Sequence, residues 1–278
     1  MPLVPASAIV TPARAAGRGV GAFNVIGIEH AEALVLGAEA AGTPVILAIS
    51  ENCVAYHGGL EPIAAATLAL ARAARIPASV HLDHAESEAL IDQAIALGIP
   101  SVMFDASRLP FADNVRATRA VVEAAHAMDV WVEAELGEVG GKDGVHAPGA
   151  RTDPQEAADY VMATGVDALA VAVGTSHAMT TRDAALDLPL IAHLRATVPV
   201  PLVLHGSSGV PDDELRRAIE AGMTKINIAT HLNHVYTDAV RVWLAANPAK
   251  VDPRLYQGAG RAAIAAEVTR LLGVLRAG

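Results

Sequence analysis

The stretch Ser79-Val80-His81-Leu82-Asp83-His84 is a β-branched, apolar run that stops on an acid and a histidine. Such a run is typical of a buried strand that gives way to a loop. Two more histidines also come after apolar runs, since His177 follows the run 169–173 and His205 follows residues 201–204. Three strand ends can meet at one point only if the strands lie side by side and parallel. The sequence therefore predicts a parallel sheet with these histidines at one edge.

The rest of the chain repeats one unit, an apolar strand followed by a loop and an Ala-rich amphipathic helix. The predicted strands are residues 20–25, 44–49, 78–82, 101–104, 130–135, 168–173, 201–204 and 224–228. The predicted helices between them are residues 29–41, 62–75, 87–97, 111–128, 154–164, 188–197, 212–220 and 230–245. Eight such pairs close into a (β/α)8 TIM barrel of the α/β class. We expect a single domain over residues 1–278, with an extra C-terminal helix at 261–276.

Composition narrows the class of protein. The 278 residues are 53% hydrophobic and carry a net charge of -10, which argues against nucleic acid or an anionic membrane as partner. A phosphorylated substrate is still compatible, because backbone N–H groups at a helix start can hold phosphate. Cys53 is the only cysteine, and residues 1–19 lack the apolar segment of a signal peptide. We therefore expect a cytoplasmic protein without disulfides or membrane spans.

The three histidines predict a metal site. Each alone could be a hydrogen-bonded core histidine, but three at strand ends match a catalytic zinc site with an open fourth position. Acids lie nearby, because Asp105 ends one strand and Glu133 and Glu135 share one face of the next. Two buried glutamates are costly unless a cation or hydrogen bonds compensate them, which favours a metal neighbourhood.

Two glycine- and hydroxyl-rich segments follow the last two strands. They are Gly206-Ser207-Ser208-Gly209 and Asn227-Ile228-Ala229-Thr230, the second of which opens a helix. These are the loops where barrels bind phosphate, although the two glycines alone could simply make a turn. Residues 136–153 form a long loop with five glycines, and loops of that length are usually functional.

At the level of motifs, the chain from about residue 21 to residue 261 resembles the class II, metal-dependent ketose-bisphosphate aldolases, the family of fructose-1,6-bisphosphate and tagatose-1,6-bisphosphate aldolases. The motifs that carry the resemblance are Ala22-Phe23-Asn24, His81-Leu82-Asp83-His84, Ser101-Val102-Met103-Phe104-Asp105-Ala106-Ser107, Val132-Glu133-Ala134-Glu135-Leu136-Gly137, Gly174-Thr175-Ser176-His177, Leu204-His205-Gly206-Ser207-Ser208-Gly209 and Lys225-Ile226-Asn227-Ile228-Ala229-Thr230.

The resemblance implies a zinc ion held by His84, His177 and His205, with Asp105 and Glu135 as an inner acidic shell and potential ligands of a second ion. It also implies that Asp83 exchanges the proton of the C4 hydroxyl and that Asn227 holds the enediolate. The residues implied in binding substrate, its phosphates included, are Asn24, Ser50, Gly206, Ser207, Ser208, Gly209, Thr230 and Arg261. Family members often use a monovalent cation near the phosphate as well.

Three positions depart from the family pattern. Where many members carry a loop glutamate that exchanges the proton at the enediolate carbon, this loop is shorter and offers Asp143 after Gly140-Gly141. Ala178 replaces a usual glycine, and His231 stands where an acid is expected. Asp143 is therefore the predicted third catalytic residue, with Asp83 and Asn227.

Several alternatives remain at this stage. A Schiff-base aldolase would need a strand lysine, and Lys225 is the only one, since Lys142 and Lys250 lie in loops. The chain could also be a non-catalytic subunit that binds a sugar phosphate. Among substrates we predict fructose-1,6-bisphosphate, ahead of the tagatose epimer or another compound derived from dihydroxyacetone phosphate. Arg254 or Arg261, of the same chain or of a neighbouring subunit in a homodimer or homotetramer, are the predicted partners of the far phosphate.

Overall fold

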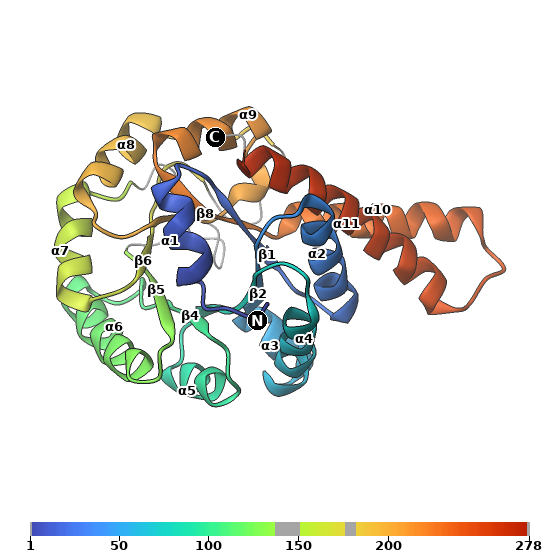
Figure 1. Ribbon diagram of the computed structural model, residues 1–278, viewed down its shortest axis with the longest axis horizontal. Coiled ribbons are helices and arrows are strands. Elements are labelled where there is room, and N and C mark those ends of the chain that lie inside the picture. Colours follow the sequence, from blue (N-terminus) through green and yellow to red (C-terminus); the bar gives the residue numbers. More distant parts are fainter. Residues whose placement is uncertain (1, 137–150, 176–181, 277–278) are drawn as a thin grey trace.

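In the computed structural model, which describes residues 2–136, 151–175 and 182–276, eight parallel strands form a closed barrel in the order β1 to β8, with β8 paired to β1. This confirms the predicted (β/α)8 TIM barrel (Figure 1). The strands are β1 Val20–Asn24, β2 Val45–Ser50, β3 Ala78–Ala85, β4 Ser101–Phe104, β5 Trp131–Glu135, β6 Ala168–Ala170, β7 Leu202–Leu204 and β8 Met223–Ile228.

Helices surround the barrel. They are α1 Ser7–Ala15, α2 Ile28–Ala41, α3 Glu51–His57, α4 Glu61–Ala73, α5 Glu88–Ala96, α6 Phe111–His126, α7 Pro154–Thr164, α8 Leu188–Thr197, α9 Asp212–Ala221, α10 Thr230–Ala246 and α11 Pro253–Arg276, with the short 3-10 helix η1 Ser207–Gly209. The extra C-terminal helix is confirmed, although it begins at Pro253 rather than at residue 261. Helix α3 was not predicted.

Strand β6 is shorter than expected. The prediction of a strand over 168–173 was wrong for its last three residues, because Ala172 and Val173 bond to loops, although the Val171 N–H still donates to the carbonyl of Val203 in β7. The Thr152 N–H donates to the carbonyl of Ala172, and the Asp187 N–H donates to that of Val173. The apolar run is therefore buried without being a strand over its whole length.

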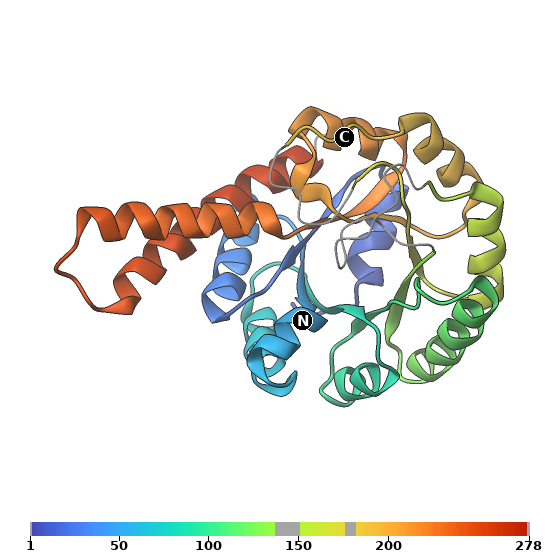
Figure 2. The ribbon, with the colours of Figure 1, turned by 180° about the vertical axis from the view of Figure 1, so that it is seen from behind.

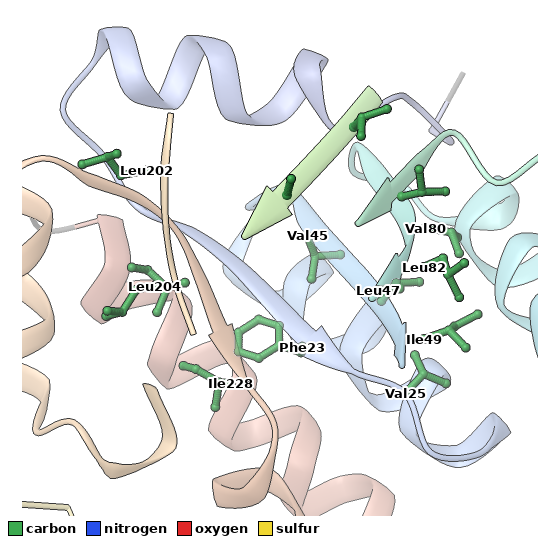
Figure 3. Packing of buried hydrophobic residues seen from close by; sticks show 14 of the residues in the cluster. Phe23, Val25, Val45, Leu47, Ile49, Val80, Leu82, Leu202, Leu204 and Ile228 are labelled. Atoms are coloured by element: carbon green, nitrogen blue, oxygen red, sulfur yellow. The ribbon is translucent and has the colours of Figure 1, made fainter. Parts of the chain in front are cut away.

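The strands bury both faces. One face packs under the helices, and its side chains include Phe23, Leu47, Val80 and Leu204 (Figure 3). The other face lines the barrel, where alternation along each strand selects every second residue. The continuous apolar run at residues 45–49 of β2 is the expected sequence of a strand covered on both sides.

Helix α1 closes the amino-terminal end of the barrel (Figure 1). Its residues Ile9 and Val10 pack against inward side chains that include Val20, Ile46 and Trp131. This end is therefore filled and apolar. The polar inward residues lie above it, toward the carboxyl ends of the strands, where barrel enzymes place their sites.

Helices α10 and α11 run together and project from one side of the barrel (Figures 1 and 2). The rings of Trp243 and Tyr256, one on each helix, lie 6.4 Å apart. Large apolar side chains remain exposed on this projection, among them Val242, Val251 and Leu255. Among the described residues, no helix combines the length and apolar character needed to cross a membrane.

Candidate metal centre and active site

Asp83 and His84 are adjacent residues, yet both belong to the same site. Side chains of neighbours in a regular strand point to opposite faces. Here the pairing of β3 with β4 shifts between Leu82 and Ala85, and His84 has φ of 52°. A bulge with a residue in the left-handed region re-aims a side chain. The strand, predicted to end at Leu82, continues through this irregularity to Ala85, and ligand atoms of Asp83 and His84 lie within 4.8 Å of each other.

His84 is oriented by Asp105. The distance from His84 Nδ1 to Asp105 Oδ2 is 2.8 Å. The other carboxylate oxygen, Oδ1, accepts from the hydroxyl of Ser107 at 2.6 Å. An imidazole N–H bonded to a fixed carboxylate sets the ring orientation and leaves the opposite nitrogen as an acceptor.

His205 is likewise bonded to a carboxylate through one ring nitrogen. Its Nε2 lies 2.9 Å from Oε1 of Glu133, and both side chains are buried. Its Nδ1 lies 2.8 Å from Nε2 of His84. If both histidines donate to their carboxylates, the two facing nitrogens are both acceptors, and two acceptors in contact call for a cation or a shared proton between them. The donor set thus fits a metal ion.

Two groups of ligand atoms share His84. One is Asp83, His84 and His205, and the other is His84, Asp105 and Glu135. The structure therefore brings four of the five predicted metal ligands together. The fifth, His177, lies outside the described residues, as does Asp143.

Asp83 is a buried carboxylate beside this centre. Its Oδ1 accepts from the side-chain amide of Asn227 at 3.3 Å. Burial alone would raise the pKa of Asp83, but the nearby side chains of His84, His205, Lys225 and His81 together lower it by more, so the pKa lies below its usual value. The structure thus places two predicted catalytic residues in contact.

The predicted phosphate loop is a tight turn beside the start of α10. Gly206 has φ of 69°, a conformation that favours glycine, and leads into η1. The Ser207 hydroxyl donates to the Leu204 carbonyl at 3.0 Å, and the Ser208 hydroxyl accepts from the backbone N–H of Ala229 at 3.2 Å. These bonds hold the turn next to Thr230, the first residue of α10. Phosphate binding here stays a prediction.

Asn24 and Ser50 lie at the carboxyl ends of β1 and β2, on the same side of the barrel as Asp83. Strand register sets Ser50 opposite Asp83. The Ser50 hydroxyl also caps α3, because it accepts from the N–H of Cys53 at 3.2 Å. A serine before Glu51, with Gly58 as the C-cap, was the local signal of this unpredicted helix.

The two arginines proposed for the far phosphate are bound elsewhere within their own chain. Arg261 Nη1 lies 2.5 Å from Glu32 Oε2 on α2, and Arg254 Nη2 lies 2.7 Å from Asp252 Oδ2. His231, the departure noted after Thr230, pairs with Glu267 of α11 at 2.6 Å. That histidine therefore joins α10 to α11.

One pairing was missed by sequence reasoning. Lys225 Nζ lies 2.8 Å from Glu133 Oε2, and both side chains are fully buried. Both residues occupy inward positions of their strands, but nothing local in the sequence indicates that β8 and β5 supply partners.

Fold and site together define a TIM barrel with a group of histidines and carboxylates that could hold a metal ion at the carboxyl ends of its strands. Residues 4–278 match the family model described as fructose-bisphosphate aldolase class-II. The chain belongs to this family.

Solved structures agree with this assignment. The YdjI aldolase from Escherichia coli K12 is 30% identical, with a TM-score of 0.85 over 98% of this chain and 97% of that one. A putative fructose-1,6-biphosphate aldolase from Coccidioides immitis is 27% identical, with a TM-score of 0.86 over 97% and 95%. The fructose-bisphosphate aldolase from Campylobacter jejuni, 22% identical over 98% and 95% with a TM-score of 0.82, shares the fold.

Proposed function

We propose that this protein is a zinc-dependent aldolase that reversibly cleaves fructose-1,6-bisphosphate into dihydroxyacetone phosphate and glyceraldehyde 3-phosphate. The observation that carries the proposal is the pair of facing nitrogens of His84 and His205, each backed by a carboxylate, with Asp83 beside them. His177 would complete the three-histidine set. Nitrogen-rich sites of this kind suit zinc, and the bound ion would stabilise negative charge that develops on the ketose oxygens.

The residues of this chain account for the proton steps. Asp83 takes the proton of the C4 hydroxyl as the C3–C4 bond breaks, so that the aldehyde leaves and the electron pair forms the enediolate. Asn227, in contact with Asp83, donates a hydrogen bond to that enediolate. Asp143 then returns a proton to C3, with Glu138 as the next candidate within the chain. The loop Gly206-Ser207-Ser208-Gly209 and Thr230 hold the phosphate, and a monovalent cation there would assist them.

Substrate choice depends on the configuration at C4, whose hydroxyl Asp83 must reach. Ser50, which stands opposite Asp83 in the register, resembles a substrate-contacting serine of the fructose-specific relatives, whereas Asn227-Ile228-Ala229-Thr230 is more similar to the tagatose-specific ones. Ser50 carries the greater weight because it lies nearer the reacting end than the phosphate loop does. One buried hydrogen bond can be worth about 1–3 kcal/mol, which corresponds to roughly a tenfold to hundredfold preference. We therefore expect kcat/KM to be higher for fructose-1,6-bisphosphate, with measurable turnover of tagatose-1,6-bisphosphate. A tenfold preference for the tagatose epimer would overturn the choice.

A second candidate is cleavage of another ketose 1-phosphate that yields dihydroxyacetone phosphate. The observation in its favour is that Arg254 and Arg261 are both engaged in ion pairs, so the far phosphate has to compete for them. Assays of both bisphosphates beside ketose 1-phosphates decide between the candidates. Turnover confined to the monophosphates would replace fructose-1,6-bisphosphate as the substrate.

The structure disfavours the Schiff-base alternative. A nucleophilic amine must be neutral and reach the substrate carbonyl, but Lys225 is enclosed and paired with Glu133. We expect borohydride with substrate to leave the enzyme active, and exhaustive chelation to abolish activity until zinc is restored. The non-catalytic alternative predicts no turnover under any of these conditions.

A further inference from the structure

Beneath the proposed metal centre, the barrel contains a lysine that the aldol chemistry does not use. Lys225 of β8 and Glu133 of β5 are both fully buried, and their Nζ and Oε2 atoms are 2.8 Å apart. Burying a charged ammonium away from water costs free energy unless an opposite charge pairs with it. Glu133 supplies the pairing.

Glu133 uses its two oxygens for two different partners. Oε2 faces Lys225, whereas Oε1 lies 2.9 Å from Nε2 of His205. Ammonium, carboxylate and imidazole thus form one chain across β8, β5 and the end of β7. The far end of that chain is His205 Nδ1, the nitrogen that faces His84.

The ammonium also lies beside a second group of residues that could hold a metal ion, because its partner Glu133 belongs to that group. His81, Asp83 and Glu133 form a second, fully enclosed group of ligand atoms within 4.8 Å of one another. His81 Nδ1 is bonded to the hydroxyl of Ser101 at 2.6 Å, and its Nε2 is 3.9 Å from carboxylate oxygens of both acids. The positive charge of Lys225, 2.8 Å from Oε2 of Glu133, opposes a second cation in this lower group.

We propose that Lys225 is a positioning residue, an internal cation that holds Glu133 against His205 and so directs the metal ion to the upper group of ligands. The inference rests on the proposed metal-dependent function. Carboxylates that orient metal-bound histidines are typically worth 10- to 100-fold in metal affinity. Lys225 would exert that effect through Glu133 without touching substrate.

The test compares Lys225→Met, Glu133→Gln and the double variant, with Ser79→Ala as a matched control for a buried polar residue of the same barrel. Zinc affinity of the metal-free proteins is measured by competition with a chromophoric chelator, and thermal unfolding of each metal-free protein reports its folding. We expect each single variant to bind zinc about 10- to 100-fold more weakly. The double variant should bind at least as tightly as Glu133→Gln, and Ser79→Ala should stay within about twofold of the wild type.

Losses that simply add in the double variant would overturn the proposal, because Lys225 would then act independently of Glu133. Wild-type affinity in Lys225→Met would overturn it as well. If Lys225→Met does not fold, the comparison of the double variant with Glu133→Gln decides. Failure of the wild-type protein to bind zinc would instead refute the proposed function. Cobalt-substituted spectra provide a second readout, since altered histidine geometry shifts the ligand-field bands of the two single variants but not those of Ser79→Ala.

Discussion

At the scale of single residues, the site depends on one irregular position. His84 adopts the left-handed region, which costs a non-glycine residue roughly 1–2 kcal/mol. In return, Asp83 and His84 serve the same centre from consecutive positions, so the proposed base lies beside a metal ligand without being required as one.

This arrangement makes a specific prediction for Asp83→Ala. We expect the variant to retain zinc, because the histidines and their carboxylate partners are intact, and to lose cleavage by about two to four orders of magnitude, the usual effect of removing a positioned acid or base. Elemental analysis and steady-state kinetics check both parts. A metal-free variant would show that Asp83 is a structural ligand rather than the base.

Asp143 can be separated from Asp83 by isotope exchange. If Asp143 exchanges the proton at the enediolate carbon, Asp143→Ala should slow tritium exchange from labelled dihydroxyacetone phosphate at least as much as it slows cleavage. Asp83→Ala is the matched comparison, since its removal affects the C4 proton instead. Unchanged exchange in Asp143→Ala would transfer the role to Glu138 or to a metal-bound water.

At the scale of elements, an ion network fastens α11 over the barrel. Arg270 of α11 binds Glu267 on its own helix and Asp212 at the start of α9, and Asp212 also binds Arg182 at 2.7 Å. Glu267 in turn reaches His231 of α10. The network explains why a histidine after Thr230 is tolerated, because its partner comes from α11.

Arg270→Met should therefore lower stability in a pH-dependent way. Burial raises the pKa of Asp212 and Glu267, but hydrogen bonds lower both by more, from Arg270 and Arg182 to Asp212 and from Arg270 and His231 to Glu267. A carboxylate with a depressed folded-state pKa stabilises above its unfolded pKa of about 4 and loses that contribution as pH falls through the folded value. We expect a loss of about 1 kcal/mol at pH 7, after allowance for solvent screening, and a smaller loss near pH 3.

Urea unfolding at both pH values measures this effect. Arg241→Met is the matched control, since Arg241 makes one exposed pair with Asp238 on its own helix. A loss that is the same at pH 3 and pH 7 would show that Arg270 contributes by packing rather than by charge.

The elements also show which features the sequence could reveal. Apolar runs located all eight strands because both of their faces are buried, and the histidines at strand ends pointed to the candidate metal centre, where the structure brings His84 and His205 together. The bulge at His84 was not visible, because Leu82 to Ala85 reads as an ordinary strand end. The Lys225–Glu133 pair was missed because it joins strands far apart in sequence, and α3 because seven residues carry too little periodicity.

At the scale of the whole molecule, the projection formed by α10, α11 and the segment between them exposes several large apolar side chains. Val242 and Val251 are 71% and 89% exposed. A projecting helix pair with exposed large apolar residues is a typical contact surface for a second copy, so it supports the predicted homodimer or homotetramer. Arg254 lies on the same projection and would be carried toward a neighbouring chain.

We therefore expect a Val242→Glu/Leu255→Glu variant to dissociate toward single chains, because both charges would have to be buried in the contact. Light scattering coupled to size exclusion measures the mass. Met162→Glu is the matched control, since Met162 is 81% exposed on α7, across the barrel from the projection (Figure 1).

If Arg254 meets the far phosphate of a neighbour's substrate, dissociation should raise KM for fructose-1,6-bisphosphate more than it changes kcat. Dissociation with an unchanged KM would show that Arg254 does not bind a neighbour's substrate. A double variant with the mass of the wild type would show that this surface is not the subunit contact.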